Sequence, residues 1–471
     1  MATKRDQLQA YRFIGQRVSS ALVSRETDPE QPPFRRVTNA AIGGLVIAAI
    51  ALLVMYVYGI VSPGGNTSWR DGRSVIVVKE TGTRYVYLNG RLHPVHNYTS
   101  ALLALGDNAK TLSISRKSLV GVTRGPAIGI PDAPDALPDP DDLLRTAWTL
   151  CSRPTEASSG AATEDSTLLV GTEPTDGQPL GDQALLLEVP ASGDHHLVWR
   201  GYRHRIDERD TVDVGLALDV ERPVRVDPAV VDILPAGDEI APIKMPDAGT
   251  PSTAVPRMPK LRTGQVLVVH ASNRTQHFIA EPDRLRRISE LQYEIQLAYK
   301  GNAKAYNNGE PKGVELGLVA LSEAAQRAAP TPSRGAAPSS LPTIANTGRD
   351  PATVCATFDS GSMVPRLRLD AHLPNKPTTS TPGRTPNGLP VADHVYVPPG
   401  QAALTQVMPS GTAPTGTLLL VTDQGRAHPL ASREVLGILG YSRVDPVLLP
   451  AGLVARVPQG SALAPAAGRS T

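Results

Sequence analysis

The sequence predicts an α+β protein with a single N-terminal transmembrane helix and an extracytoplasmic body of four small α/β repeats around a central domain. Three observations predict this fold. One long uncharged stretch lies near the N-terminus, and a strand, turn and helix pattern recurs after it. The 471 residues include 41 glycines and 44 prolines but only 4% aromatic residues, which favours several small modules over one large core.

The transmembrane helix is predicted at residues 37–62. No charged residue lies between Val37 and Trp69, and Ala40–Val61 is apolar or small throughout. These residues span roughly 33 Å as a helix, enough for a hydrocarbon core of about 30 Å. A cleaved signal peptide is the alternative, but 36 residues precede the apolar stretch, which favours an uncleaved anchor.

The charges beside the predicted helix indicate its orientation. Residues 1–36 carry seven basic and four acidic residues, and the pair Arg35-Arg36 adjoins the apolar stretch. Basic residues favour the cytoplasmic side, so the N-terminus should be cytoplasmic and residues 62–471 extracytoplasmic. We therefore expect a single-pass protein of the inner (plasma) membrane with a large periplasmic body.

The cytoplasmic tail contains a predicted amphipathic helix over residues 4–23. Its apolar residues recur every three or four positions, as on one face of a helix. This helix either lies on anionic membrane lipid or docks on cytoplasmic partner proteins. The residues of the apolar face are Leu8, Tyr11, Ile14, Val18 and Leu22.

The chain has two cysteines, Cys151 and Cys355, both in the outer part. In an oxidising compartment they can pair, and the bridge would close a loop of about 205 residues, worth up to roughly 5 kcal/mol. The alternative is two unrelated buried thiols. No Cys/His cluster in the sequence supports a metal site.

The outer body repeats a β-rich run, a turn, a basic residue near a histidine, and an apolar helical run. The first and last copies share Gly-Arg-x-His-Pro at a hairpin turn, whereas the third lacks the glycine. Because a fold is duplicated more often than chemistry, we predict a structural role for the motif residues. They are Gly90, Arg91, His93 and Pro94; Gly201, Arg203 and His204; His277; and Gly425, Arg426, His428 and Pro429.

The ends of the second and fourth copies also match in sequence. Val226-Asp227-Pro228 precedes Leu234-Pro235-Ala236-Gly237, and Val444-Asp445-Pro446 precedes Leu449-Pro450-Ala451-Gly452. We predict that these segments are equivalent. Because the cysteines lie outside all four copies, a central domain should be built from two segments, with the second and third repeats emerging from it. The predicted boundaries are 1–36 for the tail, 70–125, 196–250, 260–325 and 416–465 for the repeats, and 141–195 with 340–415 for the central domain.

The sequence lacks recognisable catalytic motifs. It contains no GxxxxGK[ST] phosphate loop, no GxGxxG after a strand, no HExxH and no GxSxG. Asp359-Ser360-Gly361-Ser362 is a faint match to a serine hydrolase, and we interpret it as a turn. The net charge of +2 argues against binding to nucleic acid. We therefore predict no catalytic residue, no metal site and no cofactor.

Several features in this order resemble the EccB family, membrane components of actinobacterial type VII (ESX) secretion systems. They are the tail segment Gln7–Phe13, Arg35-Arg36, the single span, Trp148–Cys151, Val354-Cys355 and the Gly-Arg-x-His-Pro repeats. The resemblance implies an elongated protein with a β-rich central domain bridged by its cysteine pair. It also implies assembly with EccC, EccD and EccE and with other EccB copies, and contact with peptidoglycan.

The predicted function is therefore a structural core component of a type VII secretion membrane complex. Two alternatives remain open. One is an ATP-binding hydrolase, because family members are sometimes labelled ATPases, although no residue of this sequence supports it. The other is a cell-wall-binding module.

Overall fold

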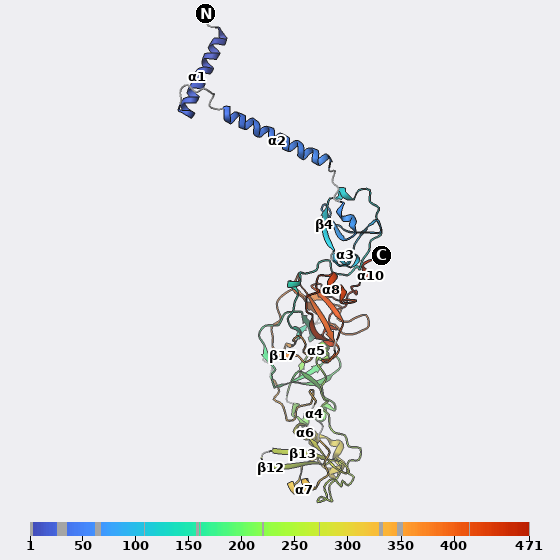
Figure 1. Cartoon of the computed structure of the whole chain (residues 1–471). Helices are drawn as coiled ribbons and strands as arrows, with labels where there is room; N and C mark the ends of the chain where they lie inside the picture. The colour runs from blue at the N-terminus through green and yellow to red at the C-terminus, as the bar shows by residue number, and fades with distance from the viewer. Residues whose placement is uncertain are drawn as a thin grey trace.

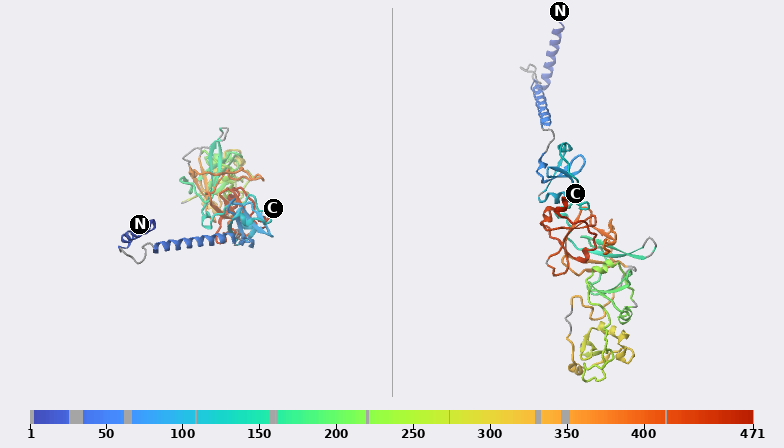
Figure 2. Two further views of the ribbon diagram at one scale, coloured as in Figure 1. Left: turned by 90° about the horizontal axis from the view of Figure 1, so that it is seen from above. Right: turned by 90° about the vertical axis from the view of Figure 1, so that its right-hand side faces the viewer.

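The computed structural model describes residues 3–25, 35–61, 67–107, 109–156, 160, 162–218, 221–272, 274–328, 333–345, 352–413 and 415–470. Two helices, α1 (Lys4–Ser24) and α2 (Arg35–Val61), project from one end of a long body (Figure 1). Figure 2 shows that this body is narrow when viewed along its length.

The N-terminal helices follow the local sequence. Thr3 and Asp6 form a capping box in which the Thr3 N–H donates to the Asp6 carboxylate at 2.9 Å, and α1 then covers the predicted 4–23. In the described part of the chain, α2 is the one helix long and apolar enough to cross a membrane, over Val37–Tyr58. None of that segment is buried against the rest of the protein, as expected for a helix whose surroundings are lipid.

Four four-stranded sheets of the body share one strand order. In each, the third, second, first and fourth strands lie side by side; the first three are joined as antiparallel hairpins, and the fourth is parallel to the first. Sheet 1 contains β1 (Ser74–Val78), β2 (Arg84–Leu88), β3 (Arg91–Pro94) and β4 (Lys110–Ile114). Sheet 2 contains β8 (Ala184–Val189), β9 (Asp194–Trp199), β10 (Tyr202–Arg205) and β11 (Val224–Arg225). Sheet 3 contains β12 (Val266–Ala271), β13 (Arg274–Ala280), β14 (Leu285–Ile288) and β15 (Val314–Glu315). Sheet 4 contains β20 (Ala402–Met408), β21 (Leu418–Thr422), β22 (Ala427–Pro429) and β23 (Val447–Pro450).

Each sheet carries helical segments at the same two places in the chain. One helix lies between the third and fourth strands: α3 (Tyr98–Leu105), α4 (Arg209–Gly215), α6 (Glu290–Ala298) or α8 (Glu434–Ile438). A shorter segment follows the fourth strand: η2 (Arg116–Leu119), α5 (Pro228–Ile233), α7 (Leu318–Glu323) or α9 (Ala451–Val454). Further short helices in the described residues are η1 (Ser68–Asp71), η3 (Pro140–Asp142), η5 (Lys300–Tyr306) and α10 (Pro465–Gly468).

Local chemistry explains the hairpins and the helix starts. Asn89 and Gly90 have φ values of 51° and 76°, and Arg200 and Gly201 have 51° and 79°, so both pairs form tight turns with two positive φ angles. The Asn97 side chain accepts from the Ser100 N–H and begins α3.

The central sheet has seven strands in the order β18-β19-β6-β5-β16-β17-β7. Its strands come from two separate stretches of the chain, and sheets 2 and 3 are formed by the residues between them. The strands are β5 (Trp148–Glu156), β6 (Ala162–Leu169), β7 (Gln178–Pro179), β16 (Val354–Phe358), β17 (Arg366–Leu369), β18 (Thr379–Ser380) and β19 (His394–Tyr396).

The first strands of sheets 2 and 4 lie outside the repeat boundaries predicted from the sequence. β8 falls within 141–195 but pairs with β9, and β20 falls within 340–415 but pairs with β21. The reason is physical: the sequence signal lies in the hairpin and histidine of the second and third strands, whereas an apolar first strand resembles any buried strand.

The sheets follow one another along the body. From α2 outward the order is sheet 1, sheet 4, the central sheet, sheet 2 and sheet 3 (Figure 1). Neighbours share apolar cores: one core joins sheets 1 and 4, a second joins the central sheet with sheets 2 and 4, and a third joins sheet 2 with α6 of sheet 3. The end of the chain returns to sheet 1, where α10 packs on α3 and the Gly129 N–H donates to the Ser470 carbonyl at 2.9 Å.

Candidate functional site: histidine contacts, disulfide and N-terminal helices

Three motif histidines occupy the same position in sheets 1, 2 and 4. Each lies on the third strand and uses Nδ1 to bond a backbone carbonyl farther along the chain: His93 to Pro126 at 3.0 Å, His204 to Asp238 at 2.7 Å, and His428 to Ser461 at 3.1 Å. Because a carbonyl only accepts, the proton resides on Nδ1 of each ring.

A glycine lies against each of these imidazole rings. The glycine precedes the residue whose carbonyl accepts the hydrogen bond, and a Cβ atom built on it would overlap the ring. The pairs are His93 with Gly125, His204 with Gly237 and His428 with Gly460. The backbone can therefore approach the face of the ring only because these residues lack a side chain.

Two of the histidines are buried in the interior of the body. His204 and His428 are fully buried, and their Nε2 atoms have no hydrogen-bond partner. Burial lowers the pKa of both imidazoles and so favours their neutral form. Carboxylates lie near both rings, because the charges of Asp238 and Asp132 oppose part of the pKa decrease at His204 and His428 respectively.

Sheet 3 departs from this arrangement. The backbone bridges Leu92↔Arg124, Arg203↔Ala236, Ala427↔Gln459 and Leu285↔Gln326 align the four sheets. By this alignment Arg286 takes the place of the histidine and Arg327 the place of the glycine. His277, predicted to belong to the motif, lies instead on the second strand and stacks on Tyr293 with ring centroids 4.4 Å apart. In the other three sheets the motif histidine is followed by a glycine 32 or 33 residues later. This spacing is the sequence signal that distinguishes those histidines from His277.

The same alignment corrects the predicted match between the ends of the second and fourth copies. Pro235-Ala236-Gly237 corresponds to Pro458-Gln459-Gly460 rather than to Pro450-Ala451-Gly452. Val226-Asp227-Pro228 leads into α5, whereas Val444-Asp445-Pro446 precedes strand β23. The two segments are therefore similar in sequence but different in structure.

The other motif residues support the hairpins and the strand edges. Gly90, Gly201 and Gly425 have positive φ angles at the turns, and Arg203 Nε donates to the Leu234 carbonyl at 3.2 Å. The carbonyls of Pro94 and Pro429 accept from the N–H groups of Ile128 and Leu463, at 2.9 Å and 2.7 Å. The side chain of Arg91 is exposed, and the Arg426 carbonyl accepts from the Thr422 N–H at 3.1 Å.

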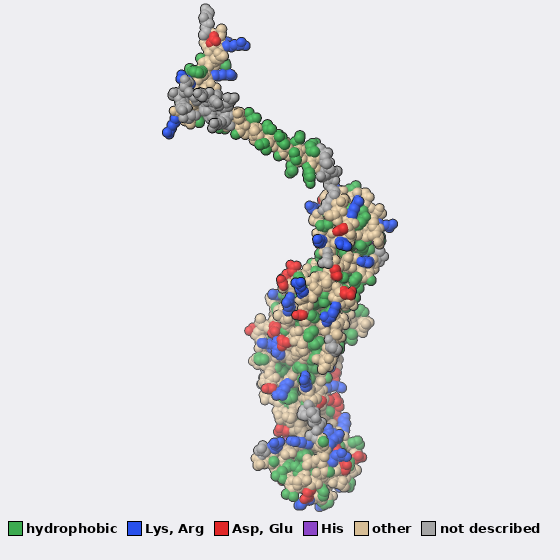
Figure 3. Space-filling model, in the orientation of Figure 1, with side chains coloured by type: hydrophobic (Ala, Val, Ile, Leu, Met, Phe, Trp, Pro, Cys, Tyr) green, Lys and Arg blue, Asp and Glu red, His purple; other side chains and the backbone are tan. Residues whose placement is uncertain are grey.

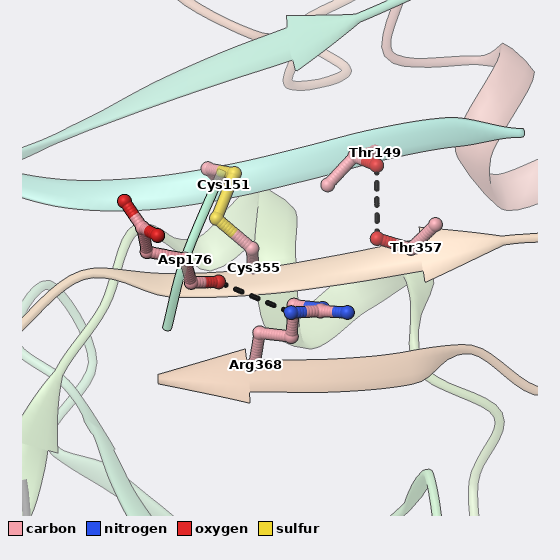
Figure 4. Close-up of a disulfide and its surroundings, with 6 residues drawn as sticks. All are labelled: Thr149, Cys151, Asp176, Cys355, Thr357 and Arg368. Atoms are coloured by element: carbon pink, nitrogen blue, oxygen red, sulfur yellow. Dashed lines mark hydrogen bonds between the residues drawn. A yellow bond between two sulfur atoms is a disulfide. The ribbon is translucent and has the colours of Figure 1, made fainter. Parts of the chain in front are cut away.

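The two cysteines form a disulfide between neighbouring strands of the central sheet (Figure 4). Cys151 on β5 is paired directly with Cys355 on β16, and both are fully buried. On the same pair of strands, the hydroxyls of Thr149 and Thr357 are hydrogen-bonded at 2.9 Å. The disulfide thus joins two strands whose cysteines are 204 residues apart in sequence. Sheets 2 and 3 are formed by the chain between these two strands.

An acidic cluster lies where α5 meets the central sheet. Asp227 accepts from the Ala229 N–H at 2.8 Å, and its own N–H donates to Ser152 Oγ at 2.9 Å. Burial, with the charges of Asp393 and Asp165 adding to it, raises the pKa of Asp227 to about 6. Its role as the N-cap of α5 explains its position without a catalytic function.

The remaining chemistry is sparse in the described residues. They contain no group of three or more His, Cys, Asp or Glu side chains placed to hold a metal ion. The Asp359-Ser360-Gly361 segment forms a turn. Arg366 Nε donates to the Asp359 carboxylate at 2.9 Å, and Ser360 Oγ accepts from the Leu448 N–H at 3.0 Å.

The predicted docking residues share an exposed face of α1. The side chains of Leu8, Tyr11, Ile14, Val18 and Leu22 are all exposed, so nothing in the protein covers them. Such a face is expected to bind membrane lipid or another protein.

These features define a class of protein: one candidate membrane-spanning helix followed by an extended body of several small mixed sheets. A family model described as "Type VII secretion system ESX-1, transport TM domain B" matches residues 1–471. The chain belongs to this family.

Similar proteins agree with this family. The chain is 28% identical over 327 residues to the ESX-1 secretion system ATPase EccB1 of Mycolicibacterium smegmatis; the match covers 68% of this chain and 65% of that relative. Two solved structures share the fold, each with a TM-score of 0.62. One, an intact ESX-5 inner membrane complex, is matched at 24% identity over 99% of this chain and 95% of that chain. The other, an EccB3 dimer from the ESX-3 core complex, is matched at 21% identity over 84% of this chain and 100% of that chain.

Proposed function

We propose that this protein is a structural core component of a type VII secretion membrane complex. Family membership over residues 1–471 carries this proposal. The fold supports it, because a membrane helix at one end of a long body suits a protein that anchors an assembly and extends away from the membrane. The solved ESX-5 inner membrane complex contains a chain of this fold.

The proposal includes an orientation. The tail of residues 1–36 lies in the cytoplasm, and the body lies on the periplasmic side of the inner membrane. The excess of basic residues before α2 supports this. The buried Cys151–Cys355 disulfide supports it as well, because disulfides persist in oxidising compartments.

The body is proposed to consist of four copies of one α/β unit around the central sheet. The common strand order of sheets 1 to 4 supports this internal repetition. The shared position of His93, His204 and His428 adds a second, independent likeness for three of the four. Each unit shares its core with a neighbour, as expected for modules too small to be stable alone.

The partners proposed are other copies of this chain and EccC, EccD and EccE type proteins, with α1 as the docking element for the cytoplasmic parts. In the test, Leu8→Ser/Ile14→Ser should reduce the amounts of the partner proteins recovered with the detergent-solubilised chain by about tenfold. The matched control Gln9→Ser/Gln16→Ser changes the polar face of the same helix. Full recovery of the partners with reduced binding of α1 to anionic vesicles would instead assign the face to lipid.

The EccB1 relative is named an ATPase, which makes ATP hydrolysis the second candidate function. The sequence has no phosphate loop, and we propose that the chain acts without ATP or another cofactor. Purified full chain that binds ATP in calorimetry and hydrolyses it would overturn this view. Co-sedimentation with isolated cell walls tests the third candidate, peptidoglycan binding.

A further inference from the structure

The unit built on sheet 1 carries a concentration of positive charge. Residues 67–125 contain nine Lys and Arg against three Asp and Glu, whereas the whole chain has a net charge of only +2. Figure 3 shows Lys and Arg side chains across the lobe next to α2. The unit of sheet 2, residues 184–240, has six basic residues against twelve acidic ones. The repeated fold therefore does not itself require an excess of basic residues.

Most of these positive charges are not neutralised within the chain. Among the residues that the structure describes, Arg84 is the only one of the nine bases in an ion pair, with Asp135 at 2.7 Å. The other eight side chains are exposed. Glu80 lies beside η2, but its carboxylate accepts from Ser115 Oγ at 2.7 Å and from the Arg116 N–H at 2.9 Å. The exposed bases are therefore available to an anionic surface.

One side of the unit faces sheet 4, and the other faces the membrane helix. Val75 belongs to the core shared with sheet 4, where α3 packs on α10 and contacts α8. The next residue, Ile76, points to the opposite face of the sheet, which is covered by Trp69 of η1 and Leu119 of η2. Because sheet 4 lies farther from α2 than sheet 1 does (Figure 1), the side of η1 and η2 is directed toward the membrane.

Four exposed bases lie on this side and form what we call the basic face. Arg70 belongs to η1, and Arg116 and Lys117 belong to η2. The Arg124 guanidinium lies 5.8 Å from the ring centroid of Tyr85, which packs on the core beneath η1 and η2. The basic face is also close to the membrane, because residue 67 follows the last residue of α2 by only six positions, at most roughly 20 Å of chain.

Acidic residues that follow the unit lie on its other side, toward sheet 4. Asp132 accepts from the Ser461 N–H at 2.9 Å. Asp139 adjoins Pro138, whose carbonyl accepts from the Tyr441 hydroxyl at 2.8 Å. The charge of this end of the body is therefore divided, with bases toward α2 and acids toward sheet 4.

We propose that the basic face docks on anionic phospholipid headgroups at the outer surface of the inner membrane. The proposal rests on the proposed function, in which α2 anchors the chain in the membrane. Headgroup phosphates complement Lys and Arg, and each base near an anionic surface strengthens binding about fivefold. The short connection to α2 keeps the face near the headgroups, so individually weak contacts act together. Docking fixes how the long body is directed away from the membrane.

The test uses the full chain in nanodiscs, with a bimane fluorophore on Thr123→Cys and a nitroxide quencher on lipid headgroups. Thr123 is exposed beside Arg124, and the native cysteines are paired. Quenching should be stronger with about one third phosphatidylglycerol in phosphatidylcholine than with phosphatidylcholine alone. The difference should disappear in about 1 M NaCl, where the Debye length is about 3 Å. Both leaflets of a nanodisc are alike, so the result does not depend on which side of the cell membrane holds the body.

A pair of charge variants tests the face itself. Arg116→Gln/Lys117→Gln should lower the ratio of docked to undocked chains at least about tenfold in the anionic nanodiscs. The matched control Lys300→Gln/Lys304→Gln removes two exposed bases of η5, on sheet 3 at the far end of the body, and should leave the ratio unchanged. All four side chains are exposed, so both variants should keep the parent melting temperature.

Three results would overturn the proposal. Equal quenching in the two lipids would assign the basic face to an acidic protein or polymer instead. Docking that persists in Arg116→Gln/Lys117→Gln, or that both variants lose equally, would show that the face is not the contact. In each case the chain would still be held in the nanodisc by α2, so the proposed membrane anchor would stand. A chain that did not enter nanodiscs would contradict the anchor, and the docking proposal with it.

Discussion

At the residue scale, the histidine contacts explain why a short motif recurs in the sequence. A ring whose Nδ1 binds a distant carbonyl and whose face touches a glycine joins the third strand of a sheet to the segment that closes it. Gly460 does not have a positive φ angle, so its backbone conformation does not require glycine. Glycine is required there because a side chain would overlap the His428 ring. The contact thus depends on two residues more than 30 positions apart.

Gly460→Ala should therefore destabilise the protein. The added methyl group would overlap the His428 ring, which is fully buried and held by the Ser461 carbonyl, so the ring cannot move aside. Overpacking of this kind costs about 1–3 kcal/mol in the free energy of unfolding, which chemical denaturation would measure. Gly317→Ala is the control, because a Cβ there meets nothing within 4 Å. Equal stabilities of the two variants would contradict the packing role.

Asp227 should make stability depend on pH. Its pKa is raised from 3.8 to about 6, mainly by burial, so the folded protein binds this proton more tightly than the unfolded chain does. The stabilising contribution is therefore present below pH about 4 and is lost as the pH rises through about 6. Asp227→Asn imitates the protonated acid and keeps an N-cap oxygen. At pH 7.5 the variant should be more stable by about 1–2 kcal/mol, after allowance for solvent screening.

The melting temperatures of both proteins, measured from pH 7.5 to pH 4, test this expectation. The two proteins differ only at residue 227, so the difference between the curves reports on Asp227. That difference should shrink as the pH falls. A difference that stays constant with pH would assign the effect to the loss of a contact rather than to the buried charge.

At the scale of elements, local patterns predicted some of the structure and missed the rest for definable reasons. Periodicity and length predicted α1 and α2, and Asn89-Gly90 predicted a hairpin turn. The fourth strands β11 and β15 are two residues long, too short to show a period. The histidine of sheet 3 was misplaced because Arg286 stands where the other sheets have the ring.

The candidate site was predictable only in part. Cys151 and Cys355 could be identified as a pair because the chain has no other cysteine. The pairing of their strands, β5 with β16, could not be predicted, because the two strands are far apart in sequence. The exposed face of α7 could not be found from the sequence. The sequence Leu318-Val319-Ala320-Leu321 is typical of a buried helix. Only the fold shows that α7 lies at the end of the body away from α2, with Leu318 and Val319 exposed.

The disulfide should stabilise the central sheet. Replacing both cysteines, as Cys151→Ser/Cys355→Ser, removes a link that closes a loop of 204 residues. On the chain-entropy model the loss is at most roughly 5 kcal/mol in the free energy of unfolding. Denaturation of the wild type with and without reductant, beside the double variant, measures it. A reductant effect on the wild type and none on the variant is expected, and equal stability in all samples would argue against a structural bridge.

At the scale of the whole molecule, the path of the chain explains how small sheets form a long body. The chain leaves the membrane helix through sheet 1, enters the central sheet, travels out through sheets 2 and 3, and returns through the central sheet to sheet 4. Because α10 packs on α3, the end of the chain closes back on sheet 1. Each junction buries apolar side chains from two sheets, so the body should resist bending at the shared cores more than at isolated linkers.

The topology of this body can be tested with single cysteines. Val120, 79% exposed in the segment after η2, should face the periplasm, and Gly15 on α1 should face the cytoplasm. Because the native cysteines are paired, Val120→Cys and Gly15→Cys each add one free thiol. A maleimide that cannot cross the inner membrane should label Val120→Cys in intact cells whose outer layers admit it, and Gly15→Cys only after lysis. The reverse pattern would place the body in the cytoplasm, where a secretion anchor of this design could not extend outward and where the Cys151–Cys355 disulfide would meet a reducing environment.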